Sequence, residues 1–588
     1  MDTRAVIGMF LGEDGQLNLP EQATVPVLCE LMYSMKEKAG ELDQTALSFH
    51  NYAADEVVHV SLRQFFTRVR AVAGRIQQVM NRGDRVAILC SNSPEYLYSY
   101  LGVMYAGCIP VPLYDPNEPG HAGHLAAVLD DATCALVLTN RASAATVRAL
   151  FASRPGTERP RILTVDALPD TLASEFDPAQ AAGSRDDIAF IQYTSGSTRN
   201  PAGVQVSHRA LLTNIVQIMI SVQPVDPISI VTWLPLHHDM GLVLCSVGAA
   251  LGFTINLMTP AAFVQKPDRW IELLSTEGKD HNVYTVVPNF ALELAARYGS
   301  PETIPGLDLS RLGAIINGSE PVTAQAIDAF VEVYGPYGLD KSVIRPSYGL
   351  AEAALIVATP QTANRPRIEV FDREALAEGR AEIVSGDGAA VASVGQPVGL
   401  SQVLIVDPQT RQEVPEGTIG EIWIHGDNVA SGYYERPDDT AATFNQTLAG
   451  DSGWLATGDL AAMIDGEIFI TGRLKDVIVI AGRNHYPADI ERTVAEATAH
   501  VTPTGIAAFA VPGADVEQLV ILAERAEGAD PAGDAAAVEA IAAAVAGSHG
   551  VRPKEVRIVE SGAIARSSSG KIARKVNQQR YIADNEAQ

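Results

Sequence analysis

Short apolar segments without polar alternation recur through the first two thirds of the chain, and they constrain its fold more than any other feature. They are rich in β-branched residues and are separated by helical patterns. The clearest are 85–90, 134–139, 187–197, 230–235, 282–288 and 312–318. Strands that are apolar on both faces are typical of sheets covered by helices on both sides. The sequence therefore predicts an α/β fold.

The pattern changes after about residue 395. Segments 401–407, 420–426 and 466–472 read as short strands separated by Gly, Pro and Asp turns, which favours a small β-rich subdomain. Further strands and an Ala-rich helix at 535–550 indicate another α/β unit. A chain of 588 residues is too long for one ordinary core. We place a domain boundary in the segment 472–476, giving domains at 1–474 and 475–588.

The composition favours a cytoplasmic protein that does not bind nucleic acid. A net charge of −27 disfavours a surface for phosphate backbones. The five cysteines show no ligand or disulfide spacing, and the N-terminus lacks an apolar leader. The uncharged stretch 240–265 is long enough to cross a bilayer, but glycines, Asn256 and Pro260 interrupt it. We expect a buried helix and a core strand there.

The segment Tyr193-Thr-Ser-Gly-Ser-Thr198 follows the strand 189–192 directly. Small residues let backbone N–H groups and hydroxyls approach a phosphate closely. On its own this hexapeptide also fits a plain flexible loop, and it is not a Walker A loop because no Gly-Lys-Ser/Thr follows.

Further motifs follow in order and together favour a nucleotide site. They are 317–321 (NGSEP), 347–353 (SYGLAEA), 457–459 (TGD), 472–476 (GRLKD) and 567–571 (SSSGK). The motif 347–353 offers an aromatic ring for a base and a carboxylate for a metal. The motifs 457–459 and 472–476 offer an acidic residue and a cation suited to ribose hydroxyls. The last places Lys571 in a loop of small residues. Each alone could be an ordinary turn, but their joint order is specific.

That order resembles the adenylate-forming superfamily of acyl-CoA synthetases, adenylation domains and luciferases, over residues 40 to 580. The resemblance implies a large N-terminal domain of two α/β subdomains plus a small β-barrel, and a smaller, mobile α+β C-terminal domain. It implies ATP and Mg²⁺ as cofactors and carboxylic acid activation as the reaction. It assigns nucleotide contacts to Thr194, Ser195, Gly196, Ser197, Thr198, Asn317, Gly318, Ser319, Glu320, Ser347, Tyr348, Gly349, Asp459 and Arg473.

The same resemblance assigns the chemistry. Lys571 matches the catalytic lysine, whose cation would bridge two anions as charge develops. Glu352 matches the magnesium-binding carboxylate, with Thr194 beside it. His238 matches the histidine next to the acyl carboxylate, although a structural histidine is its reading in isolation. Lys475 matches the hinge, and the predicted acyl pocket comprises Trp233, His238, Met240, Gly241 and Leu242, with a core tryptophan as the alternative for Trp233.

Departures from the general pattern resemble one subclass, the fatty acyl-AMP ligases. Arg199 and Ala202 stand where glycine and lysine are usual, and Ala565 replaces a proline. Residues 361–388 match the insertion of these ligases, which in that family packs on the C-terminal domain and hinders the rotation needed for CoA; a tolerated surface loop is the alternative. The motif set is similar to stand-alone actinobacterial and mycobacterial ligases that feed lipid-making polyketide synthases.

The resemblance thus implies activation of a fatty acid to acyl-adenylate, then acyl transfer to the phosphopantetheine of an acyl carrier protein or polyketide synthase. Two alternatives stay open: an acyl-CoA synthetase, which differs in the acceptor, and an inactive nucleotide- or adenylate-binding module. Retention of Lys571, Glu352 and Asp459 speaks against the module.

Overall fold

The computed structural model describes residues 8, 10–12, 15–118, 122–194, 201–361, 366–513, 516–567 and 570–586. Its largest sheet has seven strands in the order β13-β12-β11-β9-β10-β1-β2. All neighbours pair in parallel except β1 and β2. The strands are β1 (Thr45–Asn51), β2 (Glu56–Ser61), β9 (Ile228–Thr232), β10 (Thr254–Met258), β11 (Asn282–Pro288), β12 (Leu312–Gly318) and β13 (Ile344–Pro346).

Helices cover this sheet with two separate apolar clusters. One cluster contains residues of α2 (Val25–Ala39), α3 (Leu62–Gln77), α4 (Pro94–Tyr105), α8 (His208–Val222) and α9 (Asp239–Leu251). The other contains residues of α10 (Pro260–Gln265), α11 (Asp268–Glu277), α12 (Asn289–Tyr298) and α13 (Ala324–Tyr334). Helix starts follow local capping: Ser61 and Gln64 form a capping box at α3, and Ser207 accepts from the Ala210 N–H at α8.

A second parallel sheet has the order β4-β3-β5-β6. Its strands are β3 (Arg85–Leu89), β4 (Ile109–Leu113), β5 (Leu136–Thr139) and β6 (Arg161–Thr164), and α5 (Ala122–Ala132) and α6 (Ala144–Leu150) accompany them. The antiparallel pair β7 (Ile188–Thr194) and β8 (Ala202–Ser207) contributes Ile191 and Tyr193 to the same apolar cluster.

The β-rich part contains a five-stranded antiparallel sheet. It is built from β19 (Ser401–Val406), β20 (Gly420–Gly426), β21 (Gln446–Leu448), β22 (Asp451–Ile464) and β23 (Glu467–Arg473). Near it lie β14 (Tyr348–Gly349), β15 (Ile356–Thr359), β18 (Gln396–Pro397) and α15 (Pro437–Phe444). The predicted insertion provides β16 (Ile368–Phe371) and α14 (Arg373–Ala377), and β17 (Ala389–Ala392) follows it.

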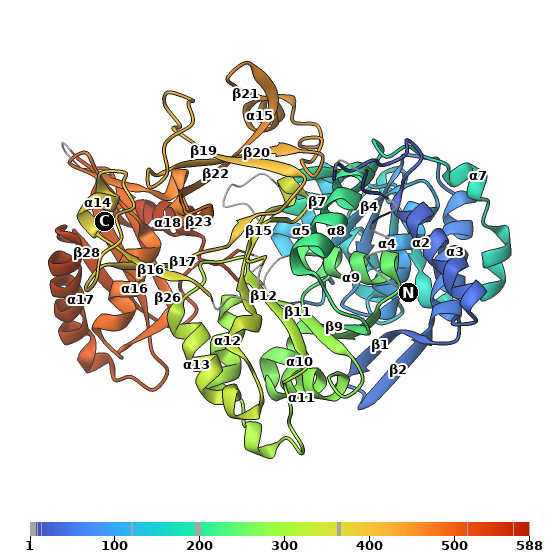
Figure 1. Cartoon of the computed structure of the whole chain (residues 1–588), viewed down its shortest axis with the longest axis horizontal. Helices are drawn as coiled ribbons and strands as arrows, with labels where there is room; N and C mark the ends of the chain where they lie inside the picture. The colour runs from blue at the N-terminus through green and yellow to red at the C-terminus, as the bar shows by residue number, and fades with distance from the viewer. Residues whose placement is uncertain are drawn as a thin grey trace.

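The C-terminal elements have cores of their own. A hairpin of β24 (Ile478–Ile480) and β25 (Arg483–His485) precedes α16 (Pro487–Ala497), and the sheet β26-β27-β28 follows. The remaining elements are β26 (Val501–Val511), β27 (Gln518–Arg525), α17 (Asp534–His549), β28 (Glu555–Val559) and α18 (Arg574–Glu586). Figure 1 shows them at the opposite end of the long axis from α2 and α3.

The structure confirms the predicted α/β class with a large N-terminal and a smaller C-terminal part. The stretch 240–265 folds as most of α9, then β10 and α10, as expected. Among the described residues, no helix is long and apolar enough to cross a membrane. The domain boundary near residue 474 stays a prediction.

Candidate active site

Three of the predicted motifs follow directly after parallel strands of the large sheet. Asn317 and Gly318 end β12, Ser347 comes after β13, and the segment with His238 follows β9. Asn317 pairs in register with Pro346. Because the carboxyl ends of parallel strands share one edge of the sheet, these residues gather at the place where α/β proteins usually bind ligands.

The backbone here is tightly packed. A Cβ on Gly318 would lie 2.6 Å from the Ser347 carbonyl oxygen, and one on Gly349 would lie 1.9 Å from the Leu355 carbonyl oxygen. Ser319 adopts a left-handed φ of 72°, which costs free energy in a non-glycine residue and is typical of functional sites. Asn317 is fully buried, and neither of its amide atoms has a partner in the described part of the chain. Buried polar groups need such partners, so Asn317 can serve a ligand.

Asp459, Tyr348 and Arg473 form one hydrogen-bonded group. The Tyr348 hydroxyl donates to Asp459 Oδ2 at 2.7 Å, and Arg473 Nε donates to Oδ1 at 3.0 Å. Asp459 and Arg473 face each other across β22 and β23, which explains why residues 14 positions apart meet. Burial raises the pKa of Tyr348, and the Asp459 carboxylate raises it further. Ser347, by contrast, donates internally to Thr359 Oγ1 at 2.8 Å.

Glu352 lies in a short turn after β14 and is half-buried. Its Oε1 accepts a hydrogen bond of 2.9 Å from the Tyr433 hydroxyl. Burial raises the pKa of Glu352, whereas the Tyr433 hydroxyl and the Arg473 cation lower it. Sequence reasoning missed Tyr433, because the two residues are 81 positions apart.

The C-terminal part brings Lys571 to this same place. Surrounding protein atoms lower the pKa of Lys571 although its side chain keeps solvent access, and Asp239, Glu320 and Asp459 act in the opposite direction. Burial raises the pKa of Glu320, while a hydrogen bond of 2.7 Å from the Phe290 N–H and the Lys571 cation lower it. Asp239, which also acts on Glu352, is a further acid that the motif comparison did not single out.

The predicted acyl-pocket residues divide between two apolar clusters. Trp233 is buried and stacks on Phe263 with ring centroids 4.0 Å apart, and Met240 packs against the same cluster. Leu242 is fully buried in the other. Gly241 leaves no room for a side chain, since a Cβ would lie 2.7 Å from the Pro235 carbonyl oxygen. His238 is the N-cap residue of α9.

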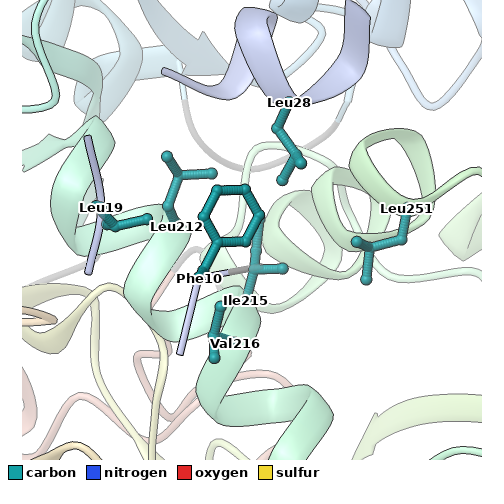
Figure 2. A pocket seen from close by; sticks show the side chains of 7 residues that line it. All are labelled: Phe10, Leu19, Leu28, Leu212, Ile215, Val216 and Leu251. Carbon is teal, nitrogen blue, oxygen red and sulfur yellow. The ribbon is translucent and has the colours of Figure 1, made fainter. Parts of the chain in front are cut away.

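Figure 2 shows an apolar cavity elsewhere, between the N-terminal segment and α2, α8 and α9. It is lined by Phe10, Leu19, Leu28, Leu212, Ile215, Val216 and Leu251. The five residues predicted for the acyl pocket are not among these. Their role stays a prediction.

The predicted phosphate loop lies mostly outside the described residues: this applies to Ser195, Gly196, Ser197 and Thr198, to the Thr194 side chain, and to Arg199. Both ends of the loop are anchored to Asp131 of α5. The Tyr193 hydroxyl donates to Asp131 Oδ2 at 2.7 Å. Arg436 donates to Asp131 Oδ1 at 2.8 Å and to the Pro201 carbonyl oxygen at 2.9 Å. Sequence reasoning identified neither Asp131 nor Arg436.

The segment 361–388 contacts the C-terminal part, which the sequence alone could not establish. Arg373 of α14 makes two hydrogen bonds to Asp489 of α16, at 2.8 and 3.2 Å. Tyr486 packs in one apolar cluster with Phe371 and Leu376. Figure 1 shows α14 beside the C-terminal elements. The predicted hinge residue Lys475 lies exposed in a short 3-10 turn between β23 and β24.

Comparison with known proteins identifies the family of the chain. Residues 36–434 match the family described as AMP-binding enzyme, and residues 475–587 match the AMP domain described as Disco-interacting protein 2-like. The chain therefore belongs to the AMP-binding enzymes.

Within that class, the chain is 41% identical to the long-chain-fatty-acid–AMP ligase FadD32 of Mycolicibacterium smegmatis, over 97% of this chain and 96% of that protein. A structure from a study of fatty acyl-adenylate ligases of E. coli and L. pneumophila superposes with a TM-score of 0.82 at 27% identity, covering 97% and 100% of the two chains. The L. pneumophila fatty acyl-adenylate ligase in complex with acyl adenylate and pyrophosphate gives 0.72 at 28% identity, covering 95% and 96%. The chain is a member of the fatty acyl-AMP ligases.

Proposed function

We propose that this enzyme converts a fatty acid and ATP to acyl-adenylate and pyrophosphate. The carboxylate oxygen attacks the α-phosphorus, the bond to the bridging oxygen breaks, and pyrophosphate leaves. The observation that carries the proposal is the convergence of Lys571, Arg473, Asp459 and Glu320 on one site from both parts of the chain. A cation there can stabilise charge between a carboxylate and a phosphate. We propose a cytoplasmic location, which the use of ATP supports.

Residues around the site would divide the work of binding. Asp459, held by Tyr348 and Arg473, has the oxygen acceptors that ribose hydroxyls require. Asn317 offers a buried amide to the nucleotide. The phosphate loop 194–198 would hold the β- and γ-phosphates, since Tyr193 and Pro201 on either side of it are anchored to Asp131, directly or through Arg436.

The site also suits Mg²⁺. Magnesium in such enzymes binds one or two carboxylates together with substrate phosphates. Glu352 is a half-buried oxygen donor, and among the described residues no cluster of three or more ligands competes for the ion. When bound, Mg²⁺ would neutralise charge on the departing pyrophosphate. Glu352, with Thr194, is the group that would hold it.

For the second step, we propose transfer of the acyl group to the phosphopantetheine thiol of an acyl carrier protein or polyketide synthase. The thiol sulfur attacks the acyl carbon, and AMP leaves. The contact between Arg373 and Asp489 supports this acceptor over CoA, because it ties segment 361–388 to the part of the chain that must rotate.

The test supplies purified enzyme with ATP, Mg²⁺ and fatty acids of different lengths, then adds either CoA or a phosphopantetheinylated carrier protein. Pyrophosphate release and an acyl-adenylate detected by mass spectrometry are expected, with thioester formed on the carrier protein. No pyrophosphate with any acid would contradict the first step. Efficient acyl-CoA formation would contradict the acceptor but leave the first step intact.

A further inference from the structure

The segment 430–440 connects two predicted parts of the active site, Glu352 and the strands that flank the phosphate loop. Its residues pair with the open edge of β8: Ser431 N donates to the Gln205 carbonyl at 2.9 Å, Gln205 N donates to the Gly432 carbonyl at 2.9 Å, and Tyr434 N donates to the Gly203 carbonyl at 2.8 Å. These bonds place residues 431–434 beside β8 as a third extended segment next to the pair β7 and β8. The segment is therefore fixed to the strands that flank the phosphate loop.

The same segment reaches Glu352 through both its backbone and a side chain. Ala430 N donates to the Glu352 carbonyl at 2.8 Å, and the Tyr433 hydroxyl donates to Glu352 Oε1 at 2.9 Å. A hydrogen bond to an ionised carboxylate is stronger than one between neutral groups and fixes the direction of the acceptor. Tyr433 can therefore set where the remaining carboxylate oxygen points.

Tyr433 itself has little freedom to move. Its N–H donates to Thr440 Oγ1 at 2.9 Å, and its ring packs edge-on against Phe444 with centroids 5.0 Å apart. Gly432 permits this fold of the chain, because it has a φ of 134° and a Cβ there would lie 2.5 Å from Thr440 Cγ2. Three residues later, Arg436 is held by Asp131 and the Pro201 carbonyl.

We propose that Tyr433 is a positioning residue that orients the Glu352 carboxylate toward the magnesium ion of Mg·ATP, with its own position fixed by the contacts of the segment 430–440 to β8. This inference rests on the proposed function, in which Glu352 holds the metal. Partners that orient a metal ligand typically change metal affinity by roughly 10- to 100-fold when they are removed. In this inference Tyr433 acts through Glu352, to which its hydroxyl donates, and not by its own contact with the metal or the substrate.

The test is Tyr433→Phe, which removes the hydroxyl and keeps the ring on Phe444. The matched control is Tyr434→Phe, because that neighbouring hydroxyl donates to Glu435 at 2.8 Å and not to Glu352. Affinity for Mn²⁺ in the presence of ATP, without fatty acid, is measured by electron paramagnetic resonance. The KM for Mg²⁺ and the kcat of pyrophosphate release are measured separately, and thermal unfolding compares stability.

We expect Tyr433→Phe to bind Mn²⁺ about 10-fold more weakly and to need about 10-fold more Mg²⁺, with a much smaller change in kcat at saturating Mg²⁺. Tyr434→Phe should match the wild type. Unchanged metal affinity in Tyr433→Phe, or an equal loss of rate at every Mg²⁺ concentration, would overturn the inference. A wild-type enzyme that forms no adenylate would instead contradict the proposed function.

Discussion

At the scale of single residues, we expect the replacement of Lys571 to reduce the reaction rate most. Its replacement by alanine removes the cation placed among Asp239, Glu320 and Asp459. Loss of one such stabilising group costs about 10²- to 10³-fold in rate. We predict this loss for Lys571→Ala in pyrophosphate release, with ATP binding still measurable by calorimetry. Lys575→Ala, at an exposed position of α18, is the matched control. Equal turnover in the two variants would show that the lysine assignment is wrong.

The environment of Lys571 also predicts a pH dependence. Its pKa is lowered, first by desolvation, so the lysine loses its proton at a lower pH than a free lysine does. If the cation is required, the rate of adenylate formation falls at high pH, with a midpoint below the ordinary lysine pKa. Lys571→Arg keeps its charge at every accessible pH, and any activity it retains should lack this alkaline decline. A wild-type profile that stays flat beyond the ordinary lysine pKa contradicts the requirement.

Residue-level assignments from the sequence were possible where a motif is contiguous. Asp459 and Arg473 were both assigned, and the structure joins them by a hydrogen bond. It failed for Tyr433 and Asp131, whose partners are 81 and 305 residues away, because such pairs have no local signature. Trp233 shows a different limit: an aromatic residue after a strand can serve a pocket or the core, and here it stacks on Phe263.

At the scale of elements, α14 joins the insertion to α16. The Arg373–Asp489 pair is mostly shielded, with side-chain exposures of 16% and 14%, so it is worth more than an ordinary surface ion pair. We predict that Arg373→Ala loosens this contact and raises the rate of acyl-CoA formation from CoA several-fold, while adenylate formation changes little. The measurement is a CoA-dependent thioester assay.

Arg380→Ala is the control for that variant. Arg380 lies in the same insertion but pairs with Glu378 and Glu382 on the surface. It should behave like the wild type. If Arg373→Ala accepts CoA no better than Arg380→Ala, the ion pair does not restrain the C-terminal part.

The positions of the strands could be predicted from the sequence far better than the contacts between distant segments. Segments 282–288 and 312–318 coincide with β11 and β12 because both are apolar on both faces and buried. The family resemblance predicts that 361–388 is an insertion but not where it packs, since Arg373 and Asp489 are 116 residues apart. That docking depends on how α14 and α16 are arranged in space, which no local sequence pattern specifies.

At the scale of the whole molecule, the predicted boundary between the two parts falls in the short turn that contains Lys475. A rotation between the two reaction steps would change backbone angles there, and proline fixes φ. We predict that Lys475→Pro forms acyl-adenylate at close to the wild-type rate but transfers it to a carrier protein at least about 10-fold more slowly. Single-turnover experiments separate the two steps. Equal slowing of both would place the hinge elsewhere.

The molecule should also lose stability in mild acid. Burial lowers the pKa of His208 and of His549 to about 4, so both stay neutral in the folded state while the unfolded chain binds protons below about pH 6.5. The free energy of unfolding therefore falls as the pH drops from 6.5 to 4. At pH 5 each histidine accounts for a loss of about 2 kcal/mol in the free energy of unfolding, relative to neutral pH. Urea unfolding should show a weaker decline in His549→Gln; an identical decline contradicts this origin.

The most direct test of the whole account follows the oxygen of the substrate. A fatty acid labelled with ¹⁸O in its carboxylate is incubated with the enzyme, ATP, Mg²⁺ and a phosphopantetheinylated carrier protein, and the released AMP is analysed by mass spectrometry. Attack of the carboxylate on the α-phosphorus leaves one ¹⁸O atom in each AMP. AMP without the label, or release of ADP and phosphate in its place, would contradict activation through an acyl-adenylate.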